Sequence, residues 1–313
     1  MRVVIALGGN AMTAPDGSAT PEAQHDAVAR ASVPIAELVE QGHEVVVTHG
    51  NGPQVGNILV KNELAAAVVP PVPLSWCGAQ TQATLGMLLM NYLERELGRR
   101  GLDRRPATLV SRTLVDATDQ AFENRTKPIG RYLAREDAEA LIAHGETYVE
   151  VPGRGWRRVV ASPEPLECLD IEAARVLLGQ GFVVVCNGGG GIPTVRRPDG
   201  GLEGIEAVID KDLTAALLAE SVGADVLVIA TDVENVVAGW GTPEAAPIGE
   251  VDAAALRRMA EGRAFPAGSM GPKVEAVTRF VERTGGRAAI TSLDRLSDAV
   301  AGRAGTRVAP ASA

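Results

Sequence analysis

The sequence predicts an α/β protein in which a mostly parallel sheet is covered by helices on both faces. Short apolar runs rich in Val and Ile alternate with helical segments along the chain, and strands buried on both faces have this composition. The expected strands are residues 3–7, 43–48, 182–186, 225–231 and 287–291. Ligands of such sheets bind beyond the carboxyl ends of the strands, so we expect the site in the loops there.

The expected helices have recognisable start and stop signals. They cover residues 20–42, about 79–99, 213–223 and 272–284. In the first of them, Thr20 occupies the N-cap position, Pro21 the first helical position and Gly42 the stop. We expect Pro34 to kink or divide this helix, and we expect the tail from about Gly302 to be frayed.

Composition limits the classes of protein to which the chain can belong. Its 313 residues are 46% hydrophobic and carry a formal net charge of −9, which indicates a globular core and argues against a nucleic-acid partner. No apolar run reaches about 18 residues and no basic stretch precedes the first strand, so we expect neither a membrane span nor a secretory signal. Cys77, Cys168 and Cys186 lack metal-ligand spacing, which favours reduced thiols and a cytoplasmic location.

Residues 112–162 interrupt the alternation of strands and helices. They contain polar turns, one short helical segment and two short strand-like segments. The stretch is too long for an ordinary connection, so we expect an inserted subdomain or lid.

Several expected strands end in loops that would lie together at one edge of the sheet. These loops are Gly8–Gly9–Asn10, Gly50–Asn51–Gly52, Gly188–Gly189–Gly190–Gly191 and Thr231–Asp232. Glycine allows a close approach of backbone N–H groups, and four consecutive glycines favour a nest for a substrate oxyanion over a simple turn. The GxGxxG, GxxxxGK[ST] and protein-kinase motifs are absent, which argues against a dehydrogenase and against the commonest nucleotide-binding loops.

Lysine is rare in this chain, and its positions are therefore informative. Only four of the 30 basic residues are lysines, namely Lys61, Lys127, Lys211 and Lys273. Lys211 lies between two aspartates at a helix N-terminus, where a cation is electrostatically unfavourable, and Lys273 lies in the first turn of another helix. We interpret both as clamps for an anion. Lys127, in the inserted segment, fits a binding role and a solvated loop equally well, and we interpret Lys61 as a surface residue.

The chain shows no candidate general base. The four histidines have no metal-ligand spacing, and nothing resembles a Ser/His/Asp arrangement. His49 adjoins the Gly50–Asn51–Gly52 loop, but we expect a structural role for it. Phosphoryl transfer fits this residue set because positioning and charge neutralisation provide most of its catalysis. An acceptor that is already an anion, such as a carboxylate, fits best.

The motifs together closely resemble the carbamate kinase family of the amino-acid kinase superfamily. They are ALGGNA, THGNGPQVGN, TKPIG, GWRRVVASPEP, GGGGIP, EAVIDKDLTAALLAE and GSMGPKVEA, in the family's order from Val3 to about Leu293. The resemblance implies a three-layer αβα open sandwich with a small protruding subdomain. It also implies a homodimer that transfers phosphate reversibly between ATP and carbamate, with Mg²⁺ carried by the nucleotide phosphates and no confidently assigned protein ligand for the metal.

The resemblance also divides the chain and assigns roles to residues. One domain, 1–313, would contain a lobe for the phosphate acceptor (1–111 and 163–222), the inserted lid (112–162) and a lobe for the nucleotide (223–313). By motif, the transferred phosphoryl group would be held by Gly8, Gly9 and Asn10, and the carbamate end by Gly50, Asn51, Gly52 and Lys127. Lys211 and Lys273 would clamp the phosphates with Asp212 orienting them, and the nucleotide would lie near Thr231, Asp232, Met270 and Gly271.

Two alternatives remain open beside this interpretation. The first is another small-carboxylate kinase of the superfamily, but acetylglutamate-type kinases carry a lysine where this chain has Ala6. The second is a catalytically silent nucleotide-binding regulator, which the presence of all the clamp lysines disfavours. The sequence departs from the carbamate kinase pattern at Arg125 and Arg131, where proline is usual.

Overall fold

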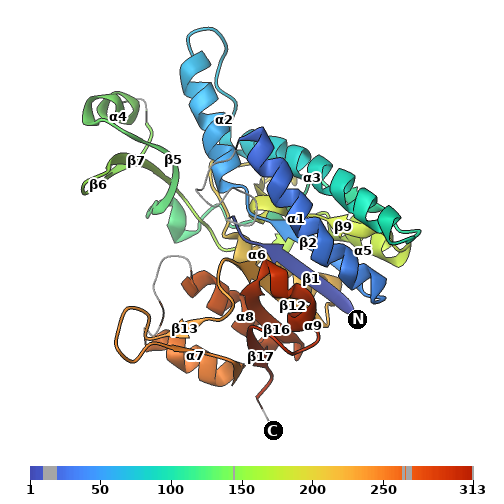
Figure 1. Cartoon of the computed structure of the whole chain (residues 1–313). Coiled ribbons are helices and arrows are strands. Elements are labelled where there is room, and N and C mark those ends of the chain that lie inside the picture. The colour runs from blue at the N-terminus through green and yellow to red at the C-terminus, as the bar shows by residue number, and fades with distance from the viewer. Residues whose placement is uncertain (10–19, 144, 263–264, 266–269, 312–313) are drawn as a thin grey trace.

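The computed structural model describes residues 1–9, 20–143, 145–262, 265 and 270–311, and its main element is an eight-stranded sheet (Figure 1). In spatial order the strands are β15 (Glu250–Asp252), β17 (Thr306–Ala309), β16 (Arg287–Ser292), β12 (Val226–Thr231), β1 (Arg2–Leu7), β2 (Glu44–His49), β9 (Val183–Val185) and β3 (Pro106–Thr108). Every neighbouring pair is parallel except β16 and β17. The mostly parallel sheet expected from the sequence is confirmed.

Helices cover both faces of this sheet, as the apolar strands require. One face packs against α1 (Pro21–Glu40), α3 (Leu74–Arg99) and α9 (Leu296–Val300). The other packs against α5 (Ile171–Gly179), α6 (Lys211–Val222), α7 (Ala253–Glu261) and α8 (Met270–Thr284). The three-layer αβα architecture is therefore confirmed.

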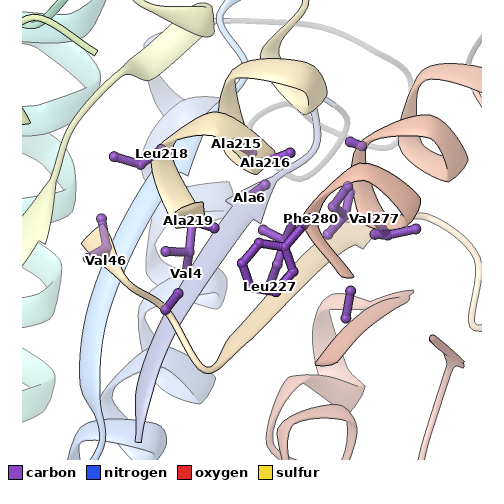
Figure 2. Close-up of a cluster of buried hydrophobic side chains, with 14 of the residues drawn as sticks. Val4, Ala6, Val46, Ala215, Ala216, Leu218, Ala219, Leu227, Val277 and Phe280 are labelled. Carbon is purple, nitrogen blue, oxygen red and sulfur yellow. The ribbon is translucent and has the colours of Figure 1, made fainter. Parts of the chain in front are cut away.

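Strand β1 shows how the alternation of side chains builds two cores. Val3, Ile5 and Leu7 point into the cluster with α1, α3 and α9, whereas Val4 and Ala6 point into the cluster with α6 and α8. Figure 2 shows this second cluster, in which Val4 and Ala6 lie with side chains of α6 and α8. The core holds β1 at the centre of the sheet and fixes the loop that follows it.

Some helix boundaries differ from the expected ones. Helix α1 runs through Pro34 without division, because Ala31 before it and Ile35 after it are fully buried and hold the helix against the sheet. Helix α3 begins at Leu74, five residues before the expected start. Helix α2 (Gly52–Ala65) was not expected at all, since it begins at Gly52, the last residue of the segment that we interpreted as a loop.

The inserted segment forms a small antiparallel sheet of its own, which projects from the body beside α2 (Figure 1). Its strands are β5 (Lys127–Leu133), β7 (Gly155–Val160) and β6 (Tyr148–Val151), in that spatial order, and α4 (Arg135–Ile142) packs on them. We call these elements the lid sheet. It has three strands rather than the expected two.

The segment on each side of the lid sheet belongs to the body of the molecule. There β4 (Arg112–Leu114) forms a second sheet with β8 (Glu167–Cys168), β10 (Ile192–Arg196) and β11 (Leu202–Gly204). The shorter elements are η2 (Gln120–Phe122), η3 (Gly188–Gly190), η4 (Leu293–Arg295), β13 (Val237–Ala238) and β14 (Ala246–Pro247). Within the described residues no helix is both long and apolar enough to cross a membrane.

The expectation of a frayed C-terminal tail was wrong. Residues Thr306–Ala309 form β17, which pairs with β16 on one side and β15 on the other. Val308 is buried, and the Thr306 hydroxyl accepts the Val236 N–H at 2.8 Å. The small polar residues of the tail do not indicate a strand, because the strands with which it pairs lie far away in the sequence.

Candidate active site

The glycine loops after β1, β2 and β9 converge at the carboxyl edge of the large sheet. Gly9, the Gly50–Asn51–Gly52 segment and Gly189 line one cavity of about 1070 Å³. Parallel strands bring their carboxyl ends to one edge, so these segments meet although they are far apart in the chain. We call this space the active-site cavity.

The loops after β1 and β2 are packed so closely that a side chain would not fit between them. A Cβ atom at Gly50 would lie 3.0 Å from the Cα of Gly9 and 3.2 Å from Cδ of Lys211. The Gly8 N–H donates to the Ala230 carbonyl at 2.8 Å, and the Gly50 N–H donates to the Leu7 carbonyl at 2.9 Å. These two N–H groups extend the strand ladder, which makes them poor candidates for holding a ligand.

Asp212 joins the two lysines that the sequence marked as anion clamps. Its Oδ1 accepts a hydrogen bond from Lys211 Nζ at 2.6 Å, and its Oδ2 accepts one from Lys273 Nζ at 3.0 Å. The Asp212 side chain is only 5% exposed and the Lys273 side chain 9%. Two helices from different parts of the chain, α6 and α8, thus present a Lys–Asp–Lys group to the cavity, in which Asp212 and Lys273 are buried. We call these three residues the lysine clamp.

Asp210 holds the start of α6 and the lysine of the lid sheet. As the N-cap, its Oδ1 accepts the Asp212 N–H at 3.0 Å, as expected for aspartate at this position. Its Oδ2 accepts a hydrogen bond from Lys127 Nζ at 2.9 Å. Lys127 therefore lies at the cavity rather than in a solvated loop.

Burial and charge shift the pKa values of two of these groups. Burial lowers the pKa of Lys211 and the nearby Lys273 ammonium lowers it further, while Asp212 and Asp210 oppose this change. Burial alone would raise the pKa of Asp210, but the Lys127 ammonium, the Asp212 N–H and Lys211 together hold it below its usual range.

The four-glycine segment is required mainly by close packing. A Cβ at Gly188 would lie 2.3 Å from Nε2 of His49, and one at Gly189 would lie 2.1 Å from Nδ2 of Asn51. Gly189 and Gly190 also have positive φ angles of 68° and 92°, which favour glycine. Of these four glycines only Gly189 lines the cavity, whereas Gly188, Gly190 and Gly191 are buried. A substrate-binding role for Gly188 and Gly190 stays a prediction.

His49 lies behind this wall and is unsuited to acid–base chemistry. It is 2% exposed, and its Nδ1–H donates to the Gly50 carbonyl at 3.1 Å. Burial lowers its pKa from 6.5 to about 4, although the hydrogen bond to Gly50 acts in the opposite direction. The ring is neutral at physiological pH, which agrees with the structural role expected for it.

Several predicted residues are not brought to this cavity. Thr231 ends β12 and donates its hydroxyl hydrogen to Asp232 Oδ1 at 3.0 Å, but neither residue is part of the cavity lining, and Met270 and Gly271 are also outside it. Asn10 lies outside the described residues. The nucleotide role of the first four residues and the phosphoryl-binding role of Asn10 stay predictions.

Comparison with known proteins decides the family. The model of the amino acid kinase family matches residues 1–292. The chain belongs to the amino acid kinase family. It is 42% identical to the carbamate kinase of Pyrococcus furiosus over 99% of both chains and 44% identical to that of Thermococcus kodakarensis over 98% of both. Its fold matches the solved carbamate kinase of Giardia lamblia bound to AMP-PNP with a TM-score of 0.94, at 39% identity, covering 99% of this chain and 98% of that one.

One residue of this amino acid kinase was missed by the sequence analysis. Lys61 projects from α2 and lines the active-site cavity, as do the other three lysines of the chain. The scarcity of lysine could have drawn attention to Lys61. Because helix α2 was not expected, however, the direction of this side chain could not be inferred from the sequence. The described lining also contains Arg131 and Arg157, so the cavity has six basic side chains against two carboxylates and suits anionic ligands.

Among the described residues no group of three or more His, Cys, Asp or Glu side chains could hold a metal ion. Both oxygens of Asp212 accept hydrogen bonds from lysines. One oxygen of Asp210 accepts a hydrogen bond from Lys127, and the other caps helix α6. This donor set fits a metal ion that is held mainly by the phosphates of a bound nucleotide, as Mg²⁺ commonly is.

Proposed function

We propose that this amino acid kinase is a carbamate kinase, which catalyses the reversible reaction ATP + carbamate = ADP + carbamoyl phosphate. The observation that carries the proposal is the convergence of Lys127, Lys211 and Lys273 around two aspartates beside the loops at Gly9 and Gly50. The near full-length similarity to carbamate kinases supports the same reaction.

The cavity is suited to phosphoryl transfer without a general base. A carbamate oxygen is already anionic, so no proton has to be removed before it attacks the phosphorus. His49 is neutral and buried, and Asp210 and Asp212 are engaged by lysines. Catalysis then depends on in-line positioning and on neutralising the charge that is spread over the transferred group.

We assign the two ends of the cavity to the two substrates. Carbamate would lie at Gly50–Asn51–Gly52 and Gly189, where Lys127 approaches from the lid sheet, and the transferred phosphoryl group would lie between Gly9 and the lysine clamp. The nucleotide would extend over residues 223–313 past Thr231, Asp232, Met270 and Gly271. Residues 1–111 and 163–222 would form the acceptor lobe. Mg²⁺, entering on the nucleotide phosphates, would supply charge neutralisation that complements the lysine clamp.

The test is a coupled assay of ATP formation from ADP and carbamoyl phosphate in the presence of Mg²⁺. We expect ATP formation by the wild type and its loss in Lys273→Ala, a control that excludes a contaminating kinase. Acetylglutamate and UMP, supplied with ATP in the opposite direction, are rival acceptors. Phosphorylation of either in place of carbamate would overturn the substrate assignment, and a folded protein that makes no ATP would refute the proposed reaction.

We also propose that the chain acts as a homodimer in the cytoplasm. Trp76 and Met87 are exposed on one side of α3, 60% and 48% respectively, as expected for a helix that packs against a second copy. Light scattering of the purified protein should give about twice the chain mass of 32.5 kDa, and a monomer at micromolar concentration would contradict this.

A further inference from the structure

The carboxylate of Asp210 contacts two separate parts of the molecule. Its Oδ1 accepts the backbone N–H groups of Asp212 and Leu213 at 3.0 and 3.4 Å, which fixes the first turn of α6. Its Oδ2 accepts a hydrogen bond from Lys127 Nζ at 2.9 Å. Lys127 is the first residue of β5, so this ion pair joins the lid sheet to the helix that carries the lysine clamp.

The Asp210–Lys127 ion pair is partly shielded from solvent and lies at the cavity. The Asp210 side chain is 15% exposed and the Lys127 side chain 40%, and both residues line the active-site cavity. Asp210 is partly withdrawn from water and held by backbone donors, so its position is defined by α6. The mobile partner is the long lysine side chain, which loses rotamer freedom when it is held.

The hydrogen bond to Asp210 uses only one of the N–H donors of the Lys127 ammonium group. An ammonium group has three N–H donors, so a hydrogen bond to Asp210 leaves two that can reach an anion in the cavity. Asp212 also accepts a hydrogen bond from each of Lys211 and Lys273. The segment Asp210–Lys211–Asp212 thus anchors three lysines that come from three different elements.

We infer that Asp210 is a positioning residue that sets the place of the lid lysine, Lys127, relative to the lysine clamp, so that the acceptor end and the phosphoryl end of the anion are held together. The inference rests on the proposed function, because it assigns Lys127 to the carbamoyl phosphate that occupies the cavity. Asp210 itself acts through Lys127 and touches no substrate.

Two further ion pairs connect the lid sheet to the body and provide matched comparisons. Arg131 Nε lies 3.0 Å from Glu63 Oε2, and an Arg158 Nη2 atom lies 3.5 Å from Glu206 Oε2. The Arg131 and Glu206 side chains are each more than half exposed, and neither pair includes a lysine. Their loss would loosen the lid sheet without releasing Lys127 from Asp210.

The experiment is Asp210→Asn, alone and combined with Lys127→Ala, assayed for ATP formation from ADP and carbamoyl phosphate. Asparagine caps a helix as well as aspartate does, so the start of α6 is kept while the charge opposite Lys127 is removed. We expect KM for carbamoyl phosphate to rise about 10-fold, as for the loss of one charge-assisted hydrogen bond, with a smaller change in kcat. In the Lys127→Ala background, Asp210→Asn should change KM less than 2-fold or so, because the residue it positions is gone.

Two outcomes would overturn the inference while the wild type stays active. One is independent, multiplying effects of Asp210→Asn and Lys127→Ala on KM. The other is an equal rise in KM for Glu63→Gln, which would show that any loosening of the lid sheet has the same effect.

A second measurement does not depend on activity. The acetylation rate of Lys127 by acetic anhydride, normalised to that of Lys61 in the same sample by mass spectrometry, should rise several-fold in Asp210→Asn and not in Glu63→Gln. If the wild type forms no ATP, the proposed function fails, and this ratio still decides whether Asp210 holds Lys127. An unchanged ratio would refute the positioning role.

Discussion

His49→Gln tests how the loops behind the active-site cavity are held together. The buried ring donates to the Gly50 carbonyl from one side and packs against Gly188 on the other. Burial lowers its pKa from 6.5 to about 4. The unfolded chain therefore binds a proton at a higher pH than the folded chain does. The stabilisation from the neutral ring is complete above pH 6.5 and is lost as the pH falls towards 4.

The size of this effect follows from the two pKa values. Each pKa unit corresponds to about 1.4 kcal/mol, so the full difference is roughly 3 kcal/mol, of which about 2 kcal/mol is lost between pH 7.5 and pH 5. Denaturant unfolding followed by circular dichroism at these two pH values should show this loss in the wild type and a loss smaller by about 2 kcal/mol in His49→Gln.

Two checks accompany this prediction. His25→Gln is the matched control, because His25 is exposed and its replacement keeps the His49 ring in place, so the loss of stability that comes from His49 should persist. In the wild type, the NMR signals of the His49 ring should titrate with a midpoint of about 4. Equal losses of stability in the wild type and His49→Gln, or a midpoint near 6.5, would refute the reasoning.

The remaining predictions concern the substrate site. Lys211→Ala and Lys273→Ala should each lower kcat on the order of 10²-fold or more, because each removes a charge that stabilises the transition state; near-normal turnover in a coupled assay would show that the lysine clamp is misassigned. Lys127→Ala should mainly raise KM for carbamoyl phosphate, since it approaches from the lid sheet, and an unchanged KM would contradict its role. Gly189→Ala should raise KM through displacement of Asn51, because the new Cβ would lie 2.1 Å from Nδ2 of that side chain; wild-type kinetics with an intact fold would exclude this contact.

The layered fold could be predicted because the pattern that produces it is local. The apolar composition of residues 3–7 predicts a strand that is buried on both faces. The ends of the first helix are indicated by Thr20, Pro21 and Gly42 without reference to the rest of the chain. Helix α2 and strand β17 could not be predicted in this way. Helix α2 begins with Gly52 and Pro53, which are typical of turns, and β17 is stabilised by pairing with β16 and β15 rather than by its own composition.

The candidate site shows the same division. The sequence marked Lys211 and Lys273 because a lysine in the first turn of a helix is electrostatically unfavourable unless it serves an anion. Residue chemistry alone left Lys127 undecided, although the family resemblance assigned it to the carbamate end, and Lys61 was interpreted as a surface residue. Only the tertiary structure shows that both line the cavity, because their orientation depends on the lid sheet and on α2.

The sequence by itself thus determined the class of the fold, and it predicted the edge of the sheet at which the candidate site lies and an anionic ligand for that site. Apolar periodicity, capping residues and rare lysines encode these features within a few neighbouring positions. The tertiary structure decided which atoms meet. Asp212, which also binds the adjacent Lys211, contacts Lys273 across 61 residues, and Asp210 contacts Lys127 across 83 residues. Such contacts depend on how helices and strands pack, and no spacing along the chain specifies that.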